Sequence, residues 1–244
     1  MEILPGIEVI GKALWLKKFR ILIIADLHIG YEEALNRQGI LVPRTLFKEL
    51  KKDLNELLEK TKPGTVVING DLKHEFQEIS EQEWKETLEI LDLMLKHGKV
   101  ILVKGNHDNI LQPIASKRKL KIVDSYCADD IGIIHGDKLL NEIVKGRGIK
   151  AKSSALPTKI LIIGHEHPAI SLKEEPKVEK YKCFLLGKWK GKKLIVMPSF
   201  LPTIEGTDVL KEKLLSPYLH QKLDNFEVFV IGDKTYRFGK LGNI

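Results

Sequence analysis

The chain has 244 residues, of which 43% are hydrophobic and 30% are charged, and its formal net charge is +7. With a mean hydropathy of −0.12, this composition is typical of a water-soluble globular protein that buries a substantial core. No apolar run approaches the length of a bilayer span, and the first residues lack the basic and apolar regions of a secretory leader. We therefore expect a cytoplasmic protein without a membrane segment.

The excess of Lys and Arg favours a polyanionic partner, although a basic surface that only aids solubility would give the same excess. Lys and Glu dominate and Gln is scarce, as is frequent in thermophile proteins, and we expect an archaeal thermophile as the source, while a Lys-rich mesophile would share this composition. Cys127 and Cys183 have no Cys-x-x-Cys spacing, which favours buried apolar side chains over a disulfide or a thiolate metal site.

Strands and helices are expected to alternate in the first half of the chain. After two short strands at 7–10 and 13–16, uninterrupted apolar runs predict strands covered on both faces, at 20–25, 65–69 and 99–104. Apolar residues at helical spacing predict a helix over 43–60, with Pro43 in its first turn. A second helix is expected to begin at the capping box of Ser80 and Glu83 and to run to about Lys96.

The second half is expected to change character. Short strands are predicted at 121–123, 131–134 and 159–163, followed by hairpins of 183–189 with 194–197 and of 226–231 with 235–238. Strands separated by helices early and hairpins late indicate two sheets in one domain, the first mostly parallel and the second with antiparallel pairs. No linker or repeat divides the chain, so we expect a single domain over 1–244.

Five of the predicted strands end in polar clusters, and ligands bind at the carboxyl ends of strands in open α/β sheets. Six of the eight histidines lie in these clusters: His28, His74, His107, His135, His165 and His167. Together with Asp26, Asp71 and Asn106 they form a set of oxygen and imidazole ligands that suits Mn²⁺, Fe or Zn²⁺. Each cluster alone is a weak signal, because Asp-x-His can be a helix cap beside a core histidine, Gly-Asp is a common turn, and a lone His-Gly after a strand is more often structural. The joint pattern therefore carries the prediction.

This joint pattern resembles the calcineurin-like metallophosphoesterases. The motifs stand in that family's order as Asp26-Leu27-His28, Gly70-Asp71, Gly105-Asn106-His107-Asp108, His135 and Gly164-His165-Glu166-His167. The resemblance implies an α/β fold with two packed mixed β-sheets flanked by helices, a four-layer α/β/β/α sandwich. It also implies two divalent metal ions, for which we favour Mn²⁺ over Fe or Zn²⁺.

The resemblance further implies a role for each residue. Asp26, His28 and His167 would bind the first metal, Asn106, His135 and His165 would bind the second, and Asp71 would bridge the two. In this family two such cations activate a water molecule that attacks phosphorus. His107 would stabilise the transition state or protonate the leaving oxygen, and His74 and Asp108 would fix the orientation of His107.

Within the superfamily, the His74 that follows Asp71 by three residues resembles the SbcD-type nuclease branch, and the motifs together resemble small archaeal phosphoesterases related to bacterial DNA-ligase-associated metallophosphoesterases. This resemblance implies a phosphodiesterase acting on nucleic acid, with single-stranded DNA favoured, in DNA repair and beside a helicase or repair partner. The alternatives are a phosphodiesterase for nucleotides or other small phosphate esters and a metal-free scaffold.

Basic residues near the motifs support a nucleic-acid partner. Lys73, Lys104 and Lys138 stand beside expected ligands, and the run 145–152 is expected to form a loop that follows a phosphate backbone. Ser199 and Phe200 are expected to face the site. The three tryptophans are better explained as packing residues than as base-stacking platforms: Trp15, Trp84 and Trp189.

Overall fold

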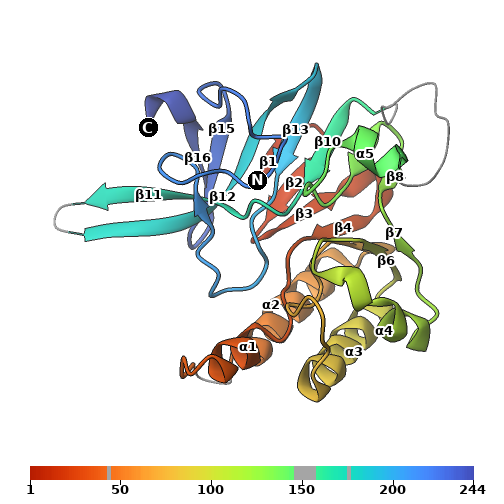
Figure 1. The fold of residues 1–244 in the computed structure, drawn as a ribbon. Helices are drawn as coiled ribbons and strands as arrows, with labels where there is room; N and C mark the ends of the chain where they lie inside the picture. The colour runs from red at the N-terminus through yellow and green to blue at the C-terminus, as the bar shows by residue number, and fades with distance from the viewer. Residues whose placement is uncertain (43–44, 146–157, 175–176) are drawn as a thin grey trace.

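The computed structural model describes residues 1–42, 45–145, 158–174 and 177–244. Two β-sheets lie face to face, with α-helices on the outer side of the first sheet (Figure 1). The fold is the expected α/β sandwich of two mixed sheets. Among the described helices, none combines the length and the apolar character needed to cross a membrane.

The first sheet has its strands in chain order: β1 (Glu2–Leu4), β2 (Ile7–Ile10), β3 (Ala13–Leu16), β4 (Ile21–Ile24), β5 (Thr65–Asn69), β6 (Lys99–Val103) and β7 (Ile122–Val123). Pairing is antiparallel from β1 to β4 and parallel from β4 to β7. The carboxyl ends of β4, β5 and β6 therefore lie at one edge of this sheet.

The second sheet has the order β14-β11-β12-β13-β10-β9-β8, with β15 pairing with β12 and with β16. Its strands are β8 (Tyr126–Ala128), β9 (Ile131–Ile133), β10 (Ile160–Ile163), β11 (Pro168–Glu174), β12 (Lys177–Trp189), β13 (Lys192–Val196), β14 (Thr207–Asp208), β15 (Glu227–Ile231) and β16 (Thr235–Lys240). Strand β10 is parallel to both β9 and β13. The carboxyl ends of these three strands again share one edge.

The helices are α1 (Tyr31–Arg37), α2 (Leu46–Thr61), α3 (Glu81–Leu95), α4 (Gln112–Lys117) and α5 (Leu140–Lys145), with 3-10 turns η1 (Lys17–Phe19), η2 (Asp108–Ile110) and η3 (Leu241–Asn243). Figure 1 shows α1 to α4 on the side of the first sheet that faces away from the second. The outer face of the second sheet packs against α5 and against buried residues of the irregular C-terminal segment, among them Val209, Tyr218 and Phe226.

The buried apolar run of β4 shows why this strand occupies the centre of the sandwich. Leu22 and Ile24 point toward the helices and belong to the same cluster as Leu54 of α2. The alternate residues Ile21 and Ile23 pack against side chains of the second sheet. Because side chains alternate across a strand, a strand covered on both faces must be apolar at every position.

The helix α3 begins as predicted, but its capping box is only half formed. The Ser80 hydroxyl accepts the Glu83 backbone N–H at 3.0 Å, which satisfies one free donor of the first turn. The Glu83 carboxylate does not return to Ser80. It accepts the backbone N–H groups of His74 (2.8 Å) and Glu75 (3.1 Å) instead, so the start of α3 holds the loop that follows β5.

Some elements were not expected from the sequence, and one expectation was wrong. The short helices α1 and α4 and the strands β8, β11 and β14 carried too few periodic residues to predict. Cys183 is buried as expected, but Cys127 is exposed because it lies on β8, the last strand on that side of the second sheet. The expected helix start at Pro43 lies outside the described residues.

Candidate metal centre

The expected ligands meet where the carboxyl ends of strands from both sheets approach each other. Asp26 and His28 follow β4, Asp71 follows β5, and Asn106 follows β6. From the second sheet, His135 follows β9, and His165 and His167 follow β10. Backbone bonds connect these loops, since the N–H of Asp26 donates to Gly70 at 3.2 Å and the N–H of Gly164 donates to His135 at 2.8 Å.

The backbone at this edge is held in an uncommon conformation. Five of the expected ligands have a positive φ: Asp26 (56°), His28 (45°), Asp71 (47°), His165 (65°) and His167 (51°). Outside glycine, each such residue costs on the order of 1–3 kcal/mol, and strained residues of this kind concentrate at functional sites. These conformations lower the stability of the fold, and the surrounding structure maintains them so that the five side chains point toward one place.

Asp26, His28 and His167 form one group whose candidate ligand atoms all lie within 4.8 Å of one another. The Nε2 atoms of the two imidazoles are 3.4 Å apart, and Nε2 of His167 is 3.4 Å from Oδ1 of Asp26. Burial and the neighbouring His167 keep the pKa of His28 well below its usual range. His28 is thus held neutral, the form in which an imidazole binds a metal.

Asp71, His135 and His165 form a second group under the same distance limit. Nε2 of His135 lies 3.3 Å from Oδ2 of Asp71 and 2.9 Å from Oδ1 of Asn106. Burial opposes charge on both members of the Asp71–His135 pair, but their mutual attraction outweighs it, so the pKa of Asp71 falls below its usual range and that of His135 rises to about 10. A cation at this position would take the place of the His135 proton.

Asp71 lies between the two groups. Its Oδ2 is 3.9 Å from Nε2 of His28, a residue of the first group, and 3.3 Å from Nε2 of His135 in the second. Its Oδ1 accepts the backbone N–H of His107 at 2.9 Å, which fixes the rotation of the carboxylate. Asp71 is therefore within 4 Å of an imidazole from each of the two groups.

Two glycines in the motifs are required by close approach. A Cβ added at Gly105 would lie 2.1 Å from Oδ1 of Asp71, and a Cβ added at Gly70 would lie 2.1 Å from Nδ1 of His135. Gly70 also has a φ of +82°, which other residues seldom adopt. These glycines leave room for ligands that come from the neighbouring strands.

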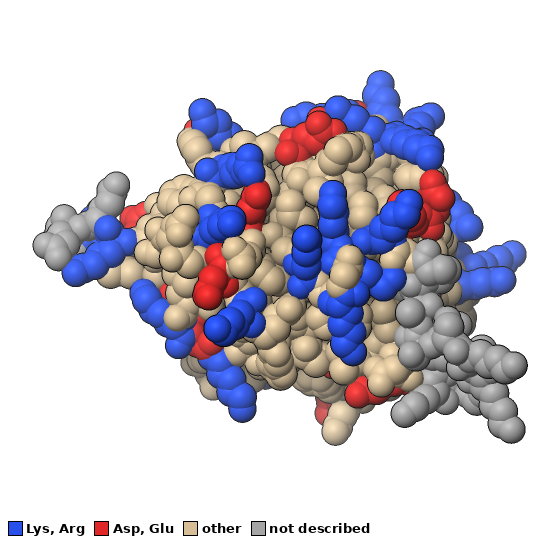
Figure 2. Space-filling model, turned by 90° about the horizontal axis from the view of Figure 1, so that it is seen from above, with Lys and Arg blue, Asp and Glu red and all other residues tan. Residues whose placement is uncertain are grey.

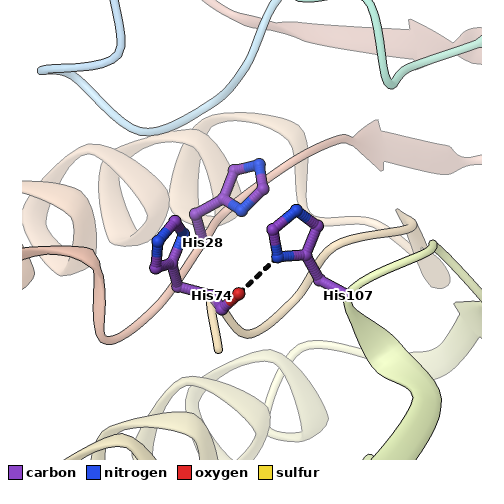
Figure 3. Close-up of side chains that lie close together, drawn as sticks. All are labelled: His28, His74 and His107. Carbon is purple, nitrogen blue, oxygen red and sulfur yellow. Dashed lines mark hydrogen bonds between the residues drawn. The ribbon is translucent and has the colours of Figure 1, made fainter. Parts of the chain in front are cut away.

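His107 follows Asn106 but points differently. Its Nδ1 bonds to the backbone carbonyl of His74, and because a carbonyl only accepts, Nδ1 must carry the proton of that bond. Its Nε2 then lies 3.8 Å from Oδ2 of Asp71. Figure 3 shows the rings of His28, His74 and His107 gathered around a common space, and these three also form a close group of candidate ligand atoms.

His74 and Asp108 were expected to fix the orientation of His107, and the two residues make different kinds of contact. His74 holds His107 through its main-chain carbonyl, while its own ring lies edge-on to Tyr31. Burial, together with the neighbouring His107, lowers the pKa of His74 to about 4. The carboxylate of Asp108 accepts the N–H groups of Gly105 (3.0 Å) and Leu72 (3.1 Å), so it acts by joining two ligand-bearing loops.

Glu83 and Ser199 support the site from outside the motifs. Glu83 holds the loop of His74, as described above. The Ser199 hydroxyl donates to the main-chain oxygen of Asp26 at 2.8 Å and accepts the N–H of Leu201 at 3.2 Å, so the segment after β13 is attached to the loop after β4. Phe200 is buried in the helix-side cluster and does not face the site. The sequence indicated that Glu83 belongs to a helix cap, but it did not indicate that the Glu83 carboxylate would bind the loop of His74.

The basic residues expected beside the site differ in their exposure to solvent. Lys73 stands beside Asp71 in the sequence as expected, but it is fully buried and donates to the carbonyl of Glu75, so it does not offer its charge to a nucleic acid. Lys104 and Lys138 are exposed. The run 145–152 lies outside the residues whose side chains are described. The tryptophans pack as expected. Trp15 and Trp84 pack against the apolar cluster between the first sheet and its helices, and Trp189 packs against the cluster on the outer face of the second sheet.

The donor set fits divalent metal ions. Each group offers a carboxylate and two imidazoles, a combination that suits Mn²⁺, Fe and Zn²⁺. Burial and neighbouring charge oppose protonation of two of these histidines, since the pKa of His28 lies well below its usual range and that of His165 is lowered to about 4. Neutral imidazoles beside ionised carboxylates are the forms that bind a cation.

A family model of calcineurin-like phosphoesterases matches residues 19–196. The match covers most of the chain, and the chain therefore belongs to the calcineurin-like phosphoesterase family. The family and the His and Asp groups together define a metal-dependent phosphoesterase.

The nuclease MPE of Pseudomonas putida is a solved structure with 17% sequence identity and a TM-score of 0.66, over 93% of this chain and 92% of that one. The phosphoesterase Yfce of E. coli has 14% identity and a TM-score of 0.42, over 91% and 97% of the two chains. The protein AQ665 of Aquifex aeolicus has 20% identity and a TM-score of 0.40, over 60% and 78%. At these identities the likeness concerns the fold. Among curated proteins, no match is found.

Proposed function

We propose that this protein is a binuclear phosphodiesterase that cleaves nucleic acid, with single-stranded DNA as its substrate and DNA repair as its context. The observation that carries the proposal is the position of His107 beside Asp71, a member of one ligand group whose Oδ2 also lies 3.9 Å from Nε2 of His28 in the other. This arrangement supplies a site for a phosphate group and a proton donor at its edge. A single domain over residues 1–244 is part of the proposal, supported by a cluster of apolar residues drawn from both sheets.

His107 is suited to protonate the leaving oxygen. The His74 carbonyl accepts the Nδ1 proton, so only the doubly protonated ring would carry a transferable proton on Nε2, the atom that faces Asp71. Its transfer to the leaving oxygen would leave the neutral ring with the Nδ1 proton in place. Its side chain is 14% exposed, which leaves it accessible to a bound phosphodiester. Imidazole is the side chain that most often serves as a general acid or base.

The other residues of the site would hold the metal ions and orient their ligands. Asp26, His28 and His167 would hold one divalent ion, Asn106, His135 and His165 would hold a second, and Asp71 would contact both; Mn²⁺ is our first choice, with Fe and Zn²⁺ as alternatives. Bound in pairs, such ions activate water and neutralise charge that develops on the phosphoryl oxygens. The N–H of His107 and the Ser199 hydroxyl would keep Asp71 and the Asp26 loop in place.

Two observations support nucleic acid as the substrate. The chain shares its fold, over nearly its full length, with a protein described as a nuclease. Its net charge is +7, and Lys and Arg outnumber Asp and Glu on the face seen in Figure 2. Positive charge attracts polyanions and raises the rate of encounter.

Small phosphate esters are the second candidate substrate. The burial of Lys73 favours them, since the cation expected next to Asp71 is not available to a phosphate backbone. A metal-free scaffold is the third candidate, and the complete set of donor groups stands against it.

An assay in Mn²⁺ should compare single-stranded DNA, duplex DNA, RNA and bis-p-nitrophenyl phosphate, with metal content measured by elemental analysis. We expect two metal ions per chain and the highest kcat/KM on single-stranded DNA, falling as salt rises because phosphate contacts are screened. Turnover of the small ester alone would establish the second candidate. A chain without metal after purification in metal-supplemented buffer would establish the scaffold. Co-purification with a helicase would test the repair context.

A further inference from the structure

The loop after β5 carries an exposed aromatic ring at the rim of the candidate metal centre. Phe76 is 47% exposed, and its ring lies on the ring of His107, with centroids 3.7 Å apart and planes inclined by 31°. Single exposed apolar side chains are common on protein surfaces. Phe76 differs from them because one face of its ring rests on the proposed proton donor.

The position of Phe76 is fixed from the residues just before it. The Glu83 carboxylate accepts the N–H groups of His74 and Glu75, and the buried Lys73 ammonium donates to the carbonyl of Glu75. An aromatic ring held in place by its loop loses little conformational freedom when a ligand stacks on it.

An open hollow of about 790 Å³ lies beside this ring, lined by Glu75, Phe76, Gln77, Glu78, Asn109 and Ile110. The carboxylates of Glu75 and Glu78 make it unsuitable for a phosphate. A planar, uncharged group suits it better, because Phe76 offers a stacking face and the polar side chains offer hydrogen-bond partners to the edge of a base.

We propose that Phe76 is a base-stacking platform that binds the nucleobase on the leaving-group side of the scissile phosphate. This inference rests on the proposed function, because the side is set by His107, the group assigned to protonate the leaving oxygen. Phe76 would then raise affinity for nucleic acid over phosphate esters that lack a base.

The test uses single-stranded oligonucleotides with one ordinary phosphodiester among phosphorothioate linkages, and one abasic residue on either side of it. Phe76→Ala should raise KM about tenfold on the unmodified strand, since stacking on an aromatic side chain strengthens binding of a base by roughly that factor or more. On the strand that is abasic on the leaving-group side, wild type and Phe76→Ala should have the same KM. Phe76→Trp should retain the wild-type preference, and Phe238→Ala, an exposed phenylalanine in the other sheet, should change neither strand.

Two outcomes would overturn the platform while the proposed function stands: an unchanged KM in Phe76→Ala, or an equal loss of kcat on every substrate, which would mean that Phe76 only positions His107. If wild type cleaves none of the strands, the proposed function fails. The platform is then decided by the fluorescence of 2-aminopurine nucleoside 5′-monophosphate. Quenching by wild type but not by Phe76→Ala supports it, and equal quenching contradicts it.

Discussion

The carboxylates of Asp71 and Glu86 are both removed from solvent, but their surroundings shift their pKa values in opposite directions. In the candidate metal centre, Asp71 is buried, yet its pKa falls because burial is outweighed by the charge of His135. In the groove between α1, α2 and α3, burial raises the pKa of Glu86 to about 7, and the neighbouring carboxylates of Glu32 and Glu33 add to the shift.

The difference shows what the histidines contribute. Burial penalises the ionised form of a carboxyl group in both places. Asp71 differs from Glu86 because imidazoles surround it, and they keep it ionised and ready to bind a cation. A cluster of acidic residues is therefore not by itself a metal site. A buried carboxyl group stays ionised beside imidazoles and becomes protonated more readily beside other carboxylates.

The strongest disruption of the centre should come from Asp71→Asn. The neutral amide removes the charge that both ligand groups share, so metal content should fall and hydrolysis should drop to background. Asp129→Asn is a matched control, because Asp129 belongs to none of the motifs, is exposed and also has a positive φ. Elemental analysis with an activity assay measures both effects. Full activity with unchanged metal would contradict the bridging role.

His107→Ala should lower kcat by about 10²- to 10⁴-fold, the usual contribution of a general acid or base. Metal content should stay at the wild-type value, because the side chain is assigned to the proton and not to a cation. His220→Ala, on an exposed histidine, should be silent. Loss of metal in His107→Ala would show that His107 is a ligand.

Gly105→Ala tests whether the space around Asp71 matters. Its Cβ would lie 2.1 Å from Oδ1 and 2.4 Å from the backbone nitrogen of Asp71, so both the carboxylate and the loop that carries it must shift. Metal affinity should fall about 10- to 100-fold, as it does when a ligand loses its orientation. Gly232→Ala, where the added Cβ meets only ordinary contacts at 3.5 Å and beyond, is the control. A metal titration that gives equal affinities for both variants would mean that the space is not needed.

The smallest effect is expected from a substitution of Glu86 in the groove between α1, α2 and α3. Because the pKa of Glu86 is raised in the folded state, its contribution to stability is present below pH 4.5 and is lost as pH rises through about 7. Glu86→Gln should therefore raise Tm at pH 8 by a few degrees at most, since solvent screens a half-buried group, and should change little at pH 4. Glu56→Gln, on an exposed side chain of α2, serves as control in the same thermal scans. Equal shifts in both variants would contradict the burial effect.

Much of the fold followed from local patterns. The strand of 65–69 was predicted with its observed bounds, and α3 begins directly after the predicted cap Ser80. Such elements depend on the period of apolar residues and on a cap, both of which lie within a few positions of the chain. The helix α1 and the seven-residue strand β11 were missed because they depend on the neighbours on which they pack.

The sequence by itself determined which donor atoms stand at the strand ends, that strands would bring them to a common edge, and the family to which the chain belongs. The roles assigned to the individual ligands, the cytoplasmic location and the single domain remain predictions. The tertiary structure alone decided that Lys73 is buried, that His74 holds His107 through its carbonyl, that Glu83 binds the loop after β5, and that Phe76 lies on His107. These contacts depend on how α3 and the loops pack onto the sheets, and packing joins residues whose sequence patterns are independent of each other.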